Sequence, residues 1–174
     1  MSNDLKKNIK DNQIVVIVVT RGQYKSSTEK IAYLESCIFK KICYVTLNKS
    51  YDTLTKDFES RKIDLDKILF IDSVSGKVDS QKGVIFVSSP KALTELSITI
   101  ADVLKKDVDS FVFDSISTLL VYVQPETSIK FIHFIISKIR SDNKNCALIA
   151  LDSDMSTSLM KDVSMFVDKV VDGA

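Results

Sequence analysis

The chain has 174 residues, of which 45% are hydrophobic and 27% are charged, and this size and composition fit one globular domain with a full core. Its 24 Lys and Arg residues nearly balance its 23 Asp and Glu residues, so charge gives no reason to expect a nucleic acid or an acidic membrane surface as partner. No apolar run approaches the roughly 18 residues that span a bilayer. The polar first dozen residues also lack the apolar core of a signal peptide, so we expect a cytoplasmic domain over residues 13–174 behind a polar tail at 1–12.

The first half of the chain alternates apolar strands with amphipathic helices. Residues 14–19, IVVIVV, are apolar without alternation, which is typical of a strand buried on both faces. A helix is expected over 27–39, because apolar side chains recur there at helical spacing. The further expected elements are a strand at 42–47, a helix at 51–61, a strand at 68–71, a soft segment at 75–82 and a strand at 84–87.

The second half continues the same alternation. Ser89 and Pro90 predict the start of a helix as N-cap and first-turn proline, and Lys105 and Lys106 suit its C-terminal end. The remaining expected elements are a strand at 111–113, a helix from Pro125 to Arg140, a strand at 147–151, a short helix at 155–161 and a strand at 166–171. About seven strands and five helices in this order predict an α/β, doubly wound domain.

The order of these elements resembles the RecA superfamily, and within it the KaiC-like ATPases, over residues 13–172. The segment VTRGQYKSS, residues 19–27, stands at the family's Walker A position, and FVFDSISTLL, residues 111–120, stands at its Walker B position. The resemblance implies a single-domain, three-layer P-loop NTPase fold with a mostly parallel central sheet and helices on both faces. It also implies a nucleotide site formed by these two segments.

Four residues are candidates for a vestigial nucleotide and magnesium site. By the resemblance, Gly22 and Lys25 would contact phosphate, Ser26 would contact magnesium, and Asp114 would hold magnesium through water. Each has a structural alternative. Ser26 and Glu29 fit the capping-box spacing S-x-x-E, Asp114 fits an ordinary acidic strand end, and Gly22 fits a tight turn. The capping-box and strand-end interpretations are favoured.

Both segments depart from the family at positions that its chemistry needs. The Walker A spacing is G-x-x-x-x-G-K-[ST], but Val19 and Tyr24 stand where glycines belong, and a Tyr side chain would project where backbone must approach phosphate. After the second strand, Asn48 and Lys49 replace the family's pair of glutamates. Neither side chain can accept a proton from the water that attacks the terminal phosphate.

The expected function is therefore a non-catalytic, regulatory or protein-interaction domain, a pseudo-ATPase with no catalytic residues, no metal ligands and no cofactor. The expected partner is another protein or a second copy of the chain. The alternative is an ATP-binding or weakly hydrolysing KaiC-like ATPase with an atypical phosphate loop, for which ATP and magnesium would be the ligands.

Other side chains predict surfaces rather than chemistry. His133 is the one histidine of the chain, and the helical projection of its segment places it on a polar arc as a solvated residue. Phe134 falls outside the main apolar stripe of the same helix, which fits either a partner surface or an ordinary exposed residue. Three cysteines lie in apolar runs without C-x-x-C spacing and are expected to be buried thiols: Cys37, Cys43 and Cys146. Three further acids follow strands and would join Asp114 in an acidic rim: Asp72, Asp152 and Asp154.

Overall fold

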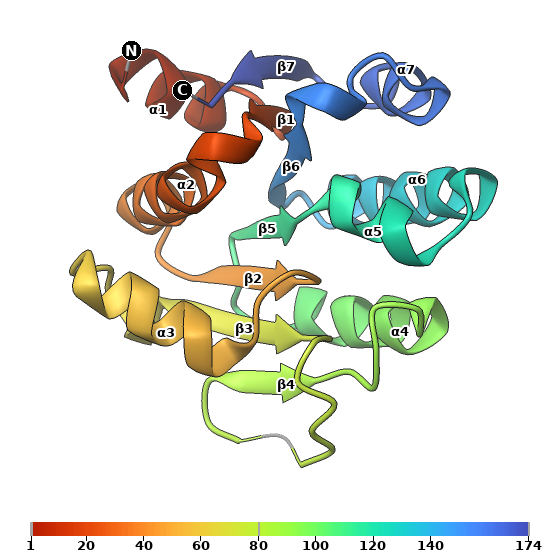
Figure 1. The fold of residues 1–174 in the computed structure, drawn as a ribbon. Coiled ribbons are helices and arrows are strands. Elements are labelled where there is room, and N and C mark those ends of the chain that lie inside the picture. Colours follow the sequence, from red (N-terminus) through yellow and green to blue (C-terminus); the bar gives the residue numbers. More distant parts are fainter. Residues whose placement is uncertain (1, 80, 174) are drawn as a thin grey trace.

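The computed structural model describes residues 2–79 and 81–173 and arranges them in three layers around a central sheet (Figure 1). The strands are β1 (Ile14–Val19), β2 (Ile42–Thr46), β3 (Ile68–Asp72), β4 (Val84–Phe86), β5 (Ser110–Asp114), β6 (Asn145–Leu151) and β7 (Lys169–Asp172). They lie in the order β4-β3-β2-β5-β6-β1-β7, and every neighbouring pair is parallel. The predicted α/β class and strand content are confirmed, with small shifts at the strand ends.

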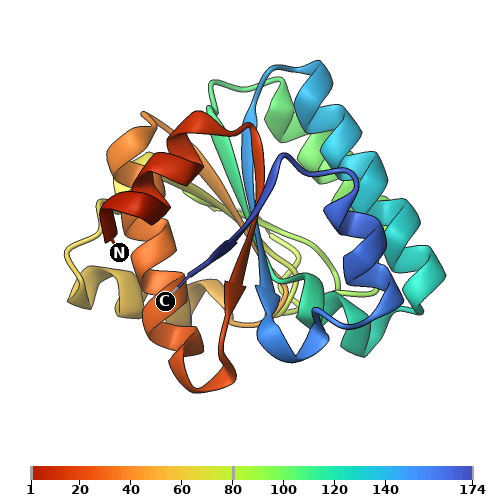
Figure 2. The same ribbon diagram turned by 90° about the horizontal axis from the view of Figure 1, so that it is seen from above.

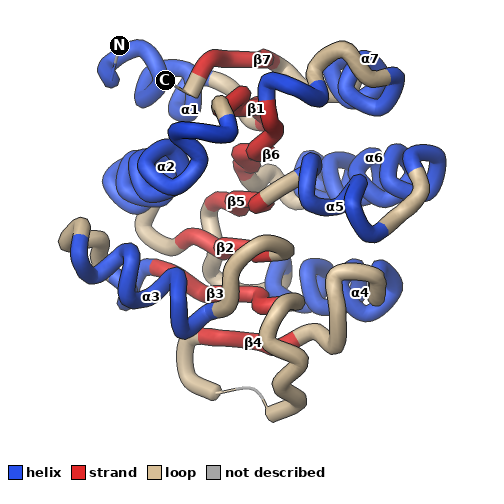
Figure 3. Tube along the Cα trace, in the orientation of Figure 1, coloured by secondary structure: helices blue, strands red, loops and turns tan. Residues whose placement is uncertain are grey.

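Helices cover both faces of this sheet. They are α1 (Ser2–Asp11), α2 (Tyr24–Ile38), α3 (Tyr51–Ser60), α4 (Leu93–Leu104), α5 (Ile116–Tyr122), α6 (Pro125–Ser141) and α7 (Ser158–Ser164), with short 3-10 helices η1 (Arg21–Gln23), η2 (Leu65–Lys67) and η3 (Asp152–Asp154). Seen from above, α1, α2 and α3 lie on one face, and α4 to α7 lie on the other (Figure 2). Figure 3 separates the red strands of the middle layer from the blue helices outside it. None of the helices in the described part of the chain is both long and apolar enough to cross a membrane.

The core consists of two apolar clusters, one on each face of the sheet. Successive strand residues point to opposite faces, so Ile14 and Val16 of β1 join the cluster under α4 to α7, while Val15 and Ile17 join the cluster under α1 to α3. Burial on both faces explains why this strand shows no apolar alternation. Because all the strands are parallel, their carboxyl ends meet at one edge of the sheet.

The segment expected as a polar tail at 1–12 is instead a helix over most of its described residues. Leu5 and Ile9 of α1 are buried in the cluster that also holds α2, and α1 lies against α2 and β7 (Figure 1). Side chains four residues apart share one face of a helix. The tail prediction is wrong because this single apolar pair, in an otherwise polar segment, is enough to attach a short helix to a core that already exists.

The start of α4 also differs from its prediction. The helix begins at Leu93 with Ala92 as its N-cap, whereas Ser89 and Pro90 lie in the turn before it, where the Ala92 N–H donates to the Ser89 carbonyl at 3.1 Å. The Ser-Pro pair therefore starts a turn rather than the helix itself. The sequence does not distinguish the two, because a proline after a polar residue suits a turn as well as the first turn of a helix.

Helix α5 was not predicted. It has 7 residues, too few for apolar periodicity to distinguish it from the strand before it. The Ser115 hydroxyl caps it by accepting from the Thr118 N–H at 3.1 Å.

Candidate functional site

The residues predicted for a nucleotide site gather at the carboxyl edge of the sheet, around the start of α2. Lys25 and Ser26 lie in the first turn of α2, and Asp114 ends β5. Gly22 lies in η1, where its φ is not positive and an added Cβ would have no heavy atom within 4 Å. Neither backbone conformation nor crowding therefore requires glycine at this turn.

Asp114 is buried at the end of β5, and two tyrosine hydroxyls bind its carboxylate. Tyr24 of α2 donates to Oδ1, and Tyr44 of β2 donates to Oδ2 at 2.7 Å. Burial raises the pKa of the Asp114 carboxyl above its usual range, while the two tyrosine hydrogen bonds act in the opposite direction. Burial, followed by the charge of Asp114, raises the pKa of both tyrosines. Both carboxylate oxygens thus have partners within the protein.

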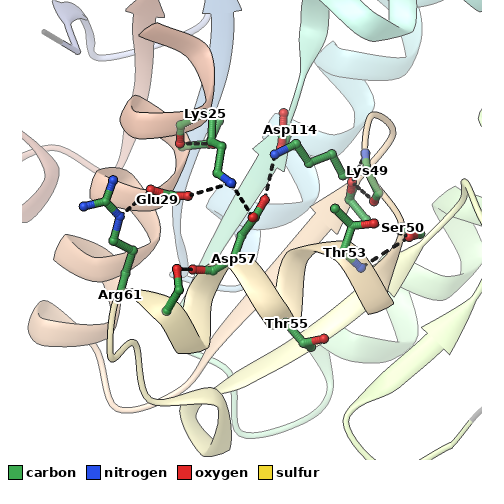
Figure 4. Close-up of polar contacts among 12 residues, drawn as sticks. Lys25, Glu29, Lys49, Ser50, Thr53, Thr55, Asp57, Arg61 and Asp114 are labelled. Carbon is green, nitrogen blue, oxygen red and sulfur yellow. Dashed lines mark hydrogen bonds and ion pairs between the residues drawn. The ribbon is translucent and has the colours of Figure 1, made fainter.

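The two lysines of the predicted site share another carboxylate. Lys25 Nζ lies 2.5 Å from Oδ1 of Asp57 on α3, and Lys49 Nζ lies 2.8 Å from Oδ2 (Figure 4). Hydrogen bonds from Lys25 and then Lys49 lower the pKa of Asp57 below its usual value. The hydrogen bond to Asp57 correspondingly raises the pKa of Lys25. Asp57 therefore stays ionised and holds both ammonium groups near the start of α2.

Glu29 points to α3 rather than to the start of its own helix. Its Oε2 accepts from Arg61 Nε at 2.7 Å, and its Oε1 lies 3.8 Å from Lys25 Nζ (Figure 4). The Ser26 hydroxyl does not accept a backbone N–H but donates to the Gln23 carbonyl at 3.0 Å. The predicted capping box is wrong because α2 begins before Ser26, so both members of the motif lie inside the helix.

A small cavity of about 220 Å³ lies beside these residues, lined in part by Tyr24, Asn48 and Ser117. The loop that carries Asn48 is held by the Thr46 hydroxyl, which accepts the Asn48 N–H at 3.3 Å and the Lys49 N–H at 3.1 Å. Cavities that bind small molecules usually measure about 300–1,000 Å³. Across residues 2–79 and 81–173, no three His, Cys, Asp or Glu side chains come together as a set of metal ligands.

The acidic rim predicted at this edge is only partly formed. Asp72 is buried, and its carboxylate accepts the Tyr51 N–H at 2.8 Å and the Val74 N–H at 2.7 Å. It therefore stabilises the loops after β2 and β3 instead of facing solvent. With Asp114 also bound inside the protein, only Asp152 and Asp154 in η3 remain near the surface.

The predicted surface residues of α6 are exposed. The His133 ring lies 4.4 Å from the Phe166 ring, centroid to centroid. Phe134 is 40% exposed, and Lys138 Nζ lies 5.8 Å from the centroid of its ring. The structure thus confirms that Phe134 falls outside the buried stripe.

The cysteine prediction is correct for Cys43 and Cys146 and wrong for Cys37, which is exposed. Cys37 lies one helical turn after Tyr33, which is also exposed, so both face outward on α2. The apolar neighbours Ile38 and Phe39 pack against the core at the end of α2, whereas Cys37 faces away from it.

Sequence reasoning missed three residues that organise the site: Tyr44, Asp57 and Arg61. The alternation of β2 would place Tyr44 on one face of the sheet, but nothing local indicates that its hydroxyl meets Asp114. Asp57 lies in α3 and Arg61 directly follows that helix, and each is 32 positions from its partner on α2. Only the packing of α3 beside α2 brings these charges together.

No protein-family model matches this sequence, and no curated protein matches it either. Solved structures do match. One is the KaiC-like protein PH0186 from the hyperthermophilic archaeon Pyrococcus horikoshii OT3, with a TM-score of 0.70 and 16% identity over 92% of this chain and 72% of that chain. Another is the uncharacterized protein PH0321 from Pyrococcus horikoshii, solved in complex with an unknown peptide, with a TM-score of 0.69 and 10% identity over 92% of this chain and 77% of that chain. The chain therefore has a KaiC-like, RecA-like fold.

Proposed function

We propose that this domain is a cytoplasmic pseudo-ATPase, with a degenerate Walker A segment, that acts as a regulatory or protein-interaction module. The observation that carries the proposal is the state of Asp114. A carboxylate that holds magnesium through water must offer free oxygens to a hydrated site. Asp114 is 1% exposed, and its two oxygens are bound by Tyr24 and Tyr44. These residues do not fit a magnesium ion.

The lysines support the same proposal. A phosphate-binding lysine must direct its ammonium group to the terminal phosphates. Lys25 instead contacts Asp57 and lies near Glu29, so two carboxylates surround its ammonium group. A phosphate placed there would be repelled by both acids and would have to displace a close ion pair.

The residues that would activate water are also unsuited to hydrolysis. Asn48 and Lys49 occupy the positions at which the family resemblance implies glutamates, and the Lys49 ammonium is bound to Asp57. An ammonium group cannot act as a general base, and an amide is too weak a base to do so. A nucleotide that entered this edge would therefore find no proton acceptor at the two positions where the family resemblance implies glutamates.

A protein partner agrees with what is known of one structural neighbour. PH0321, which shares this fold, was solved in complex with a peptide. We infer that the present domain likewise uses its surface to bind a protein segment. The polar side chains at the edge that would bind nucleotide are instead bound to one another and stabilise the fold.

The alternative function is ATP binding by an atypical phosphate loop. One observation favours it: Lys25 remains at the start of α2 with 61% of its side chain exposed. Binding would require Tyr24 to leave Asp114 and Asp57 to release Lys25. The alternative therefore predicts a conformational change on binding.

A fluorescent ATP analogue, titrated with magnesium, tests the proposal. We expect no saturable binding to the wild-type protein. We also expect no rise in its melting temperature with added ATP and magnesium, because a ligand that binds the native state would raise the melting temperature. Lys25→Ala should give the same result. Lys56→Ala is the matched control, because Lys56 is an exposed lysine on α3.

Saturable micromolar binding that is lost in Lys25→Ala and kept in Lys56→Ala would overturn the proposal in favour of the ATP-binding alternative. Light scattering over a concentration series then separates the two kinds of partner. A mass that rises with concentration indicates self-association, whereas a constant mass equal to that of one chain excludes it over that range and leaves a different protein as the expected partner.

A further inference from the structure

A cavity lies away from the predicted nucleotide site, between the start of α4 and the junction of α5 with α6. Its volume is about 810 Å³, within the range of about 300–1,000 Å³ that is usual for ligand sites. The three helices lie on the same face of the sheet (Figure 1). We call this cavity the α4–α6 groove.

The groove has an apolar floor and apolar walls. Leu93 and Val123 form part of the floor and pack against the core cluster below them. Ile98 of α4 and Tyr122 of α5 line the walls with 58% and 42% of their surfaces exposed. Two large apolar side chains facing one concave space are typical of an interaction site, whereas single exposed apolar residues are ordinary.

The polar groups at the groove are unevenly satisfied. The Glu95 carboxylate accepts from the Ser88 N–H at 3.2 Å and also binds the Ser88 hydroxyl. The Lys91 ammonium group, by contrast, has no hydrogen-bond or ion-pair partner in the described ranges, and the same holds for the side chains of Gln124 and Thr127. The groove thus offers an unpaired positive charge, one amide and one hydroxyl beside its apolar surface.

We propose that the α4–α6 groove binds a short peptide segment of a partner protein, one that carries a bulky apolar side chain next to a carboxylate. The apolar side chain lies on Leu93 and between Ile98 and Tyr122. The carboxylate pairs with Lys91, and peptide N–H and C=O groups pair with Gln124 and Thr127. This inference rests on the proposed interaction function and identifies the surface and the partner chemistry.

A short segment fits the groove better than a second copy of the chain does. A stable protein–protein interface buries about 800 Å² on each partner, which is far broader than a groove between the ends of three helices. Charge selects the kind of segment, because the Glu95 carboxylate in the lining already accepts two hydrogen bonds from Ser88, whereas the Lys91 ammonium is left to pair with a carboxylate of the segment.

Fluorescence polarisation with short labelled peptides tests the proposal. The probe alternates leucine and phenylalanine with aspartate. Of two comparison peptides, one has lysine in place of aspartate and the other has serine in place of leucine and phenylalanine. We expect saturable binding of the acidic apolar probe, with binding of each comparison peptide weaker by at least about tenfold.

Two variants locate the binding, and each has a matched control. Ile98→Glu places a negative charge in the groove and should weaken binding of the acidic probe by about tenfold or more. Lys91→Glu should weaken binding of the acidic probe and strengthen binding of the peptide that carries lysine. Val78→Glu changes an apolar residue that is 89% exposed outside the groove, and Lys56→Glu reverses an exposed charge on α3. Neither control should alter binding.

Three outcomes would overturn the inference. They are no saturable binding of any peptide, equal binding by Ile98→Glu and Val78→Glu, and a preference between acidic and basic peptides that Lys91→Glu leaves unchanged. A concentration-dependent mass that Ile98→Glu abolishes would assign the groove to a second copy instead. The proposed function fails separately, through saturable ATP binding that needs Lys25, so the two failures are distinguishable.

Discussion

The carboxyl edge of the sheet and the α4–α6 groove differ in whether their side chains have partners within the chain. At the carboxyl edge, Asp114 is bound by two tyrosines, and Lys25 shares the carboxylate of Asp57 with Lys49. In the groove, Ile98 faces solvent, and the Lys91 ammonium has no partner in the described part of the chain. Groups that are satisfied within the chain contribute to its stability, whereas unsatisfied groups remain available to another molecule. The proposed binding surface therefore lies where side chains have no partners within the chain, and not where the family resemblance implies a site.

The largest expected difference between the two regions is in how much an apolar side chain contributes to the free energy of unfolding. Phe58 of α3 is fully buried, and its ring lies 5.3 Å from the Tyr44 ring behind the carboxyl edge. Phe58→Ala should lower the free energy of unfolding by about 3–5 kcal/mol, because it removes a buried ring and leaves a cavity. Ile98→Ala in the groove should change it by less than about 0.5 kcal/mol. Urea unfolding measures both, and similar losses in the two variants would remove the distinction between the regions.

A second buried carboxyl sharpens the comparison with Asp114. Glu35 of α2 is buried, and its Oε2 has no hydrogen-bond partner among the described residues, although the nearby Ser110 side chain acts to lower the pKa of this carboxyl. Burial raises the pKa of Glu35 from 4.5 to about 8. The folded protein therefore binds this proton more tightly than the unfolded chain does. The resulting stability is fully present below about pH 4.5, is lost as the pH rises to about 8, and is constant above that.

Glu35→Gln removes this titration. The fall in the free energy of unfolding between about pH 4.5 and 8 should be smaller in the variant, by an amount of a few kcal/mol at about 1.4 kcal/mol per pKa unit. Urea unfolding at a series of pH values measures the difference between the two proteins, so that other titrating groups cancel. Parallel pH profiles would show that Glu35 ionises in the folded protein as it does in water.

The smallest expected effect comes from a single hydroxyl. Tyr44→Phe keeps the buried ring but removes the donor to Asp114 Oδ2, and should cost about 1–3 kcal/mol because a buried acceptor loses its partner. Tyr122→Phe is the matched change in the groove, where the ring is partly exposed, and it should be close to neutral. Equal effects of the two substitutions on urea unfolding would contradict the structural role assigned to the pair of tyrosines.

Much of the fold was predictable from local patterns. The apolar run at 14–19 and its successors identified the strands, and their alternation with helices identified a parallel sheet covered on both faces. Periodicity reports burial along one element, so it works best for long elements. It failed for α1, which is attached by Leu5 and Ile9, and for the short helix α5.

The candidate site was less predictable, because its contacts join distant parts of the chain. Lys25 and Asp114, which stand at the motif positions, lie at one edge of the sheet, and the Tyr24 side chain reaches the same edge through its hydrogen bond to Asp114. The motif spacing could not identify Asp57 as the partner of Lys25, because their separation in sequence carries no periodic signal. A charged residue on a helix surface gives the same sequence pattern whether its side chain faces solvent or a neighbouring helix.

By itself, the sequence determined the strand order along the chain, the three-layer class and the residue types at the carboxyl edge, since these depend on local propensity and apolar periodicity. The tertiary structure alone decided that Tyr44 and Tyr24 bind Asp114, that α3 supplies the carboxylate for two lysines, and that a groove opens between α4 and α6. Hydrogen bonds, ion pairs and cavities act over a few ångströms in space, and only packing of the layers sets which distant residues come within that range.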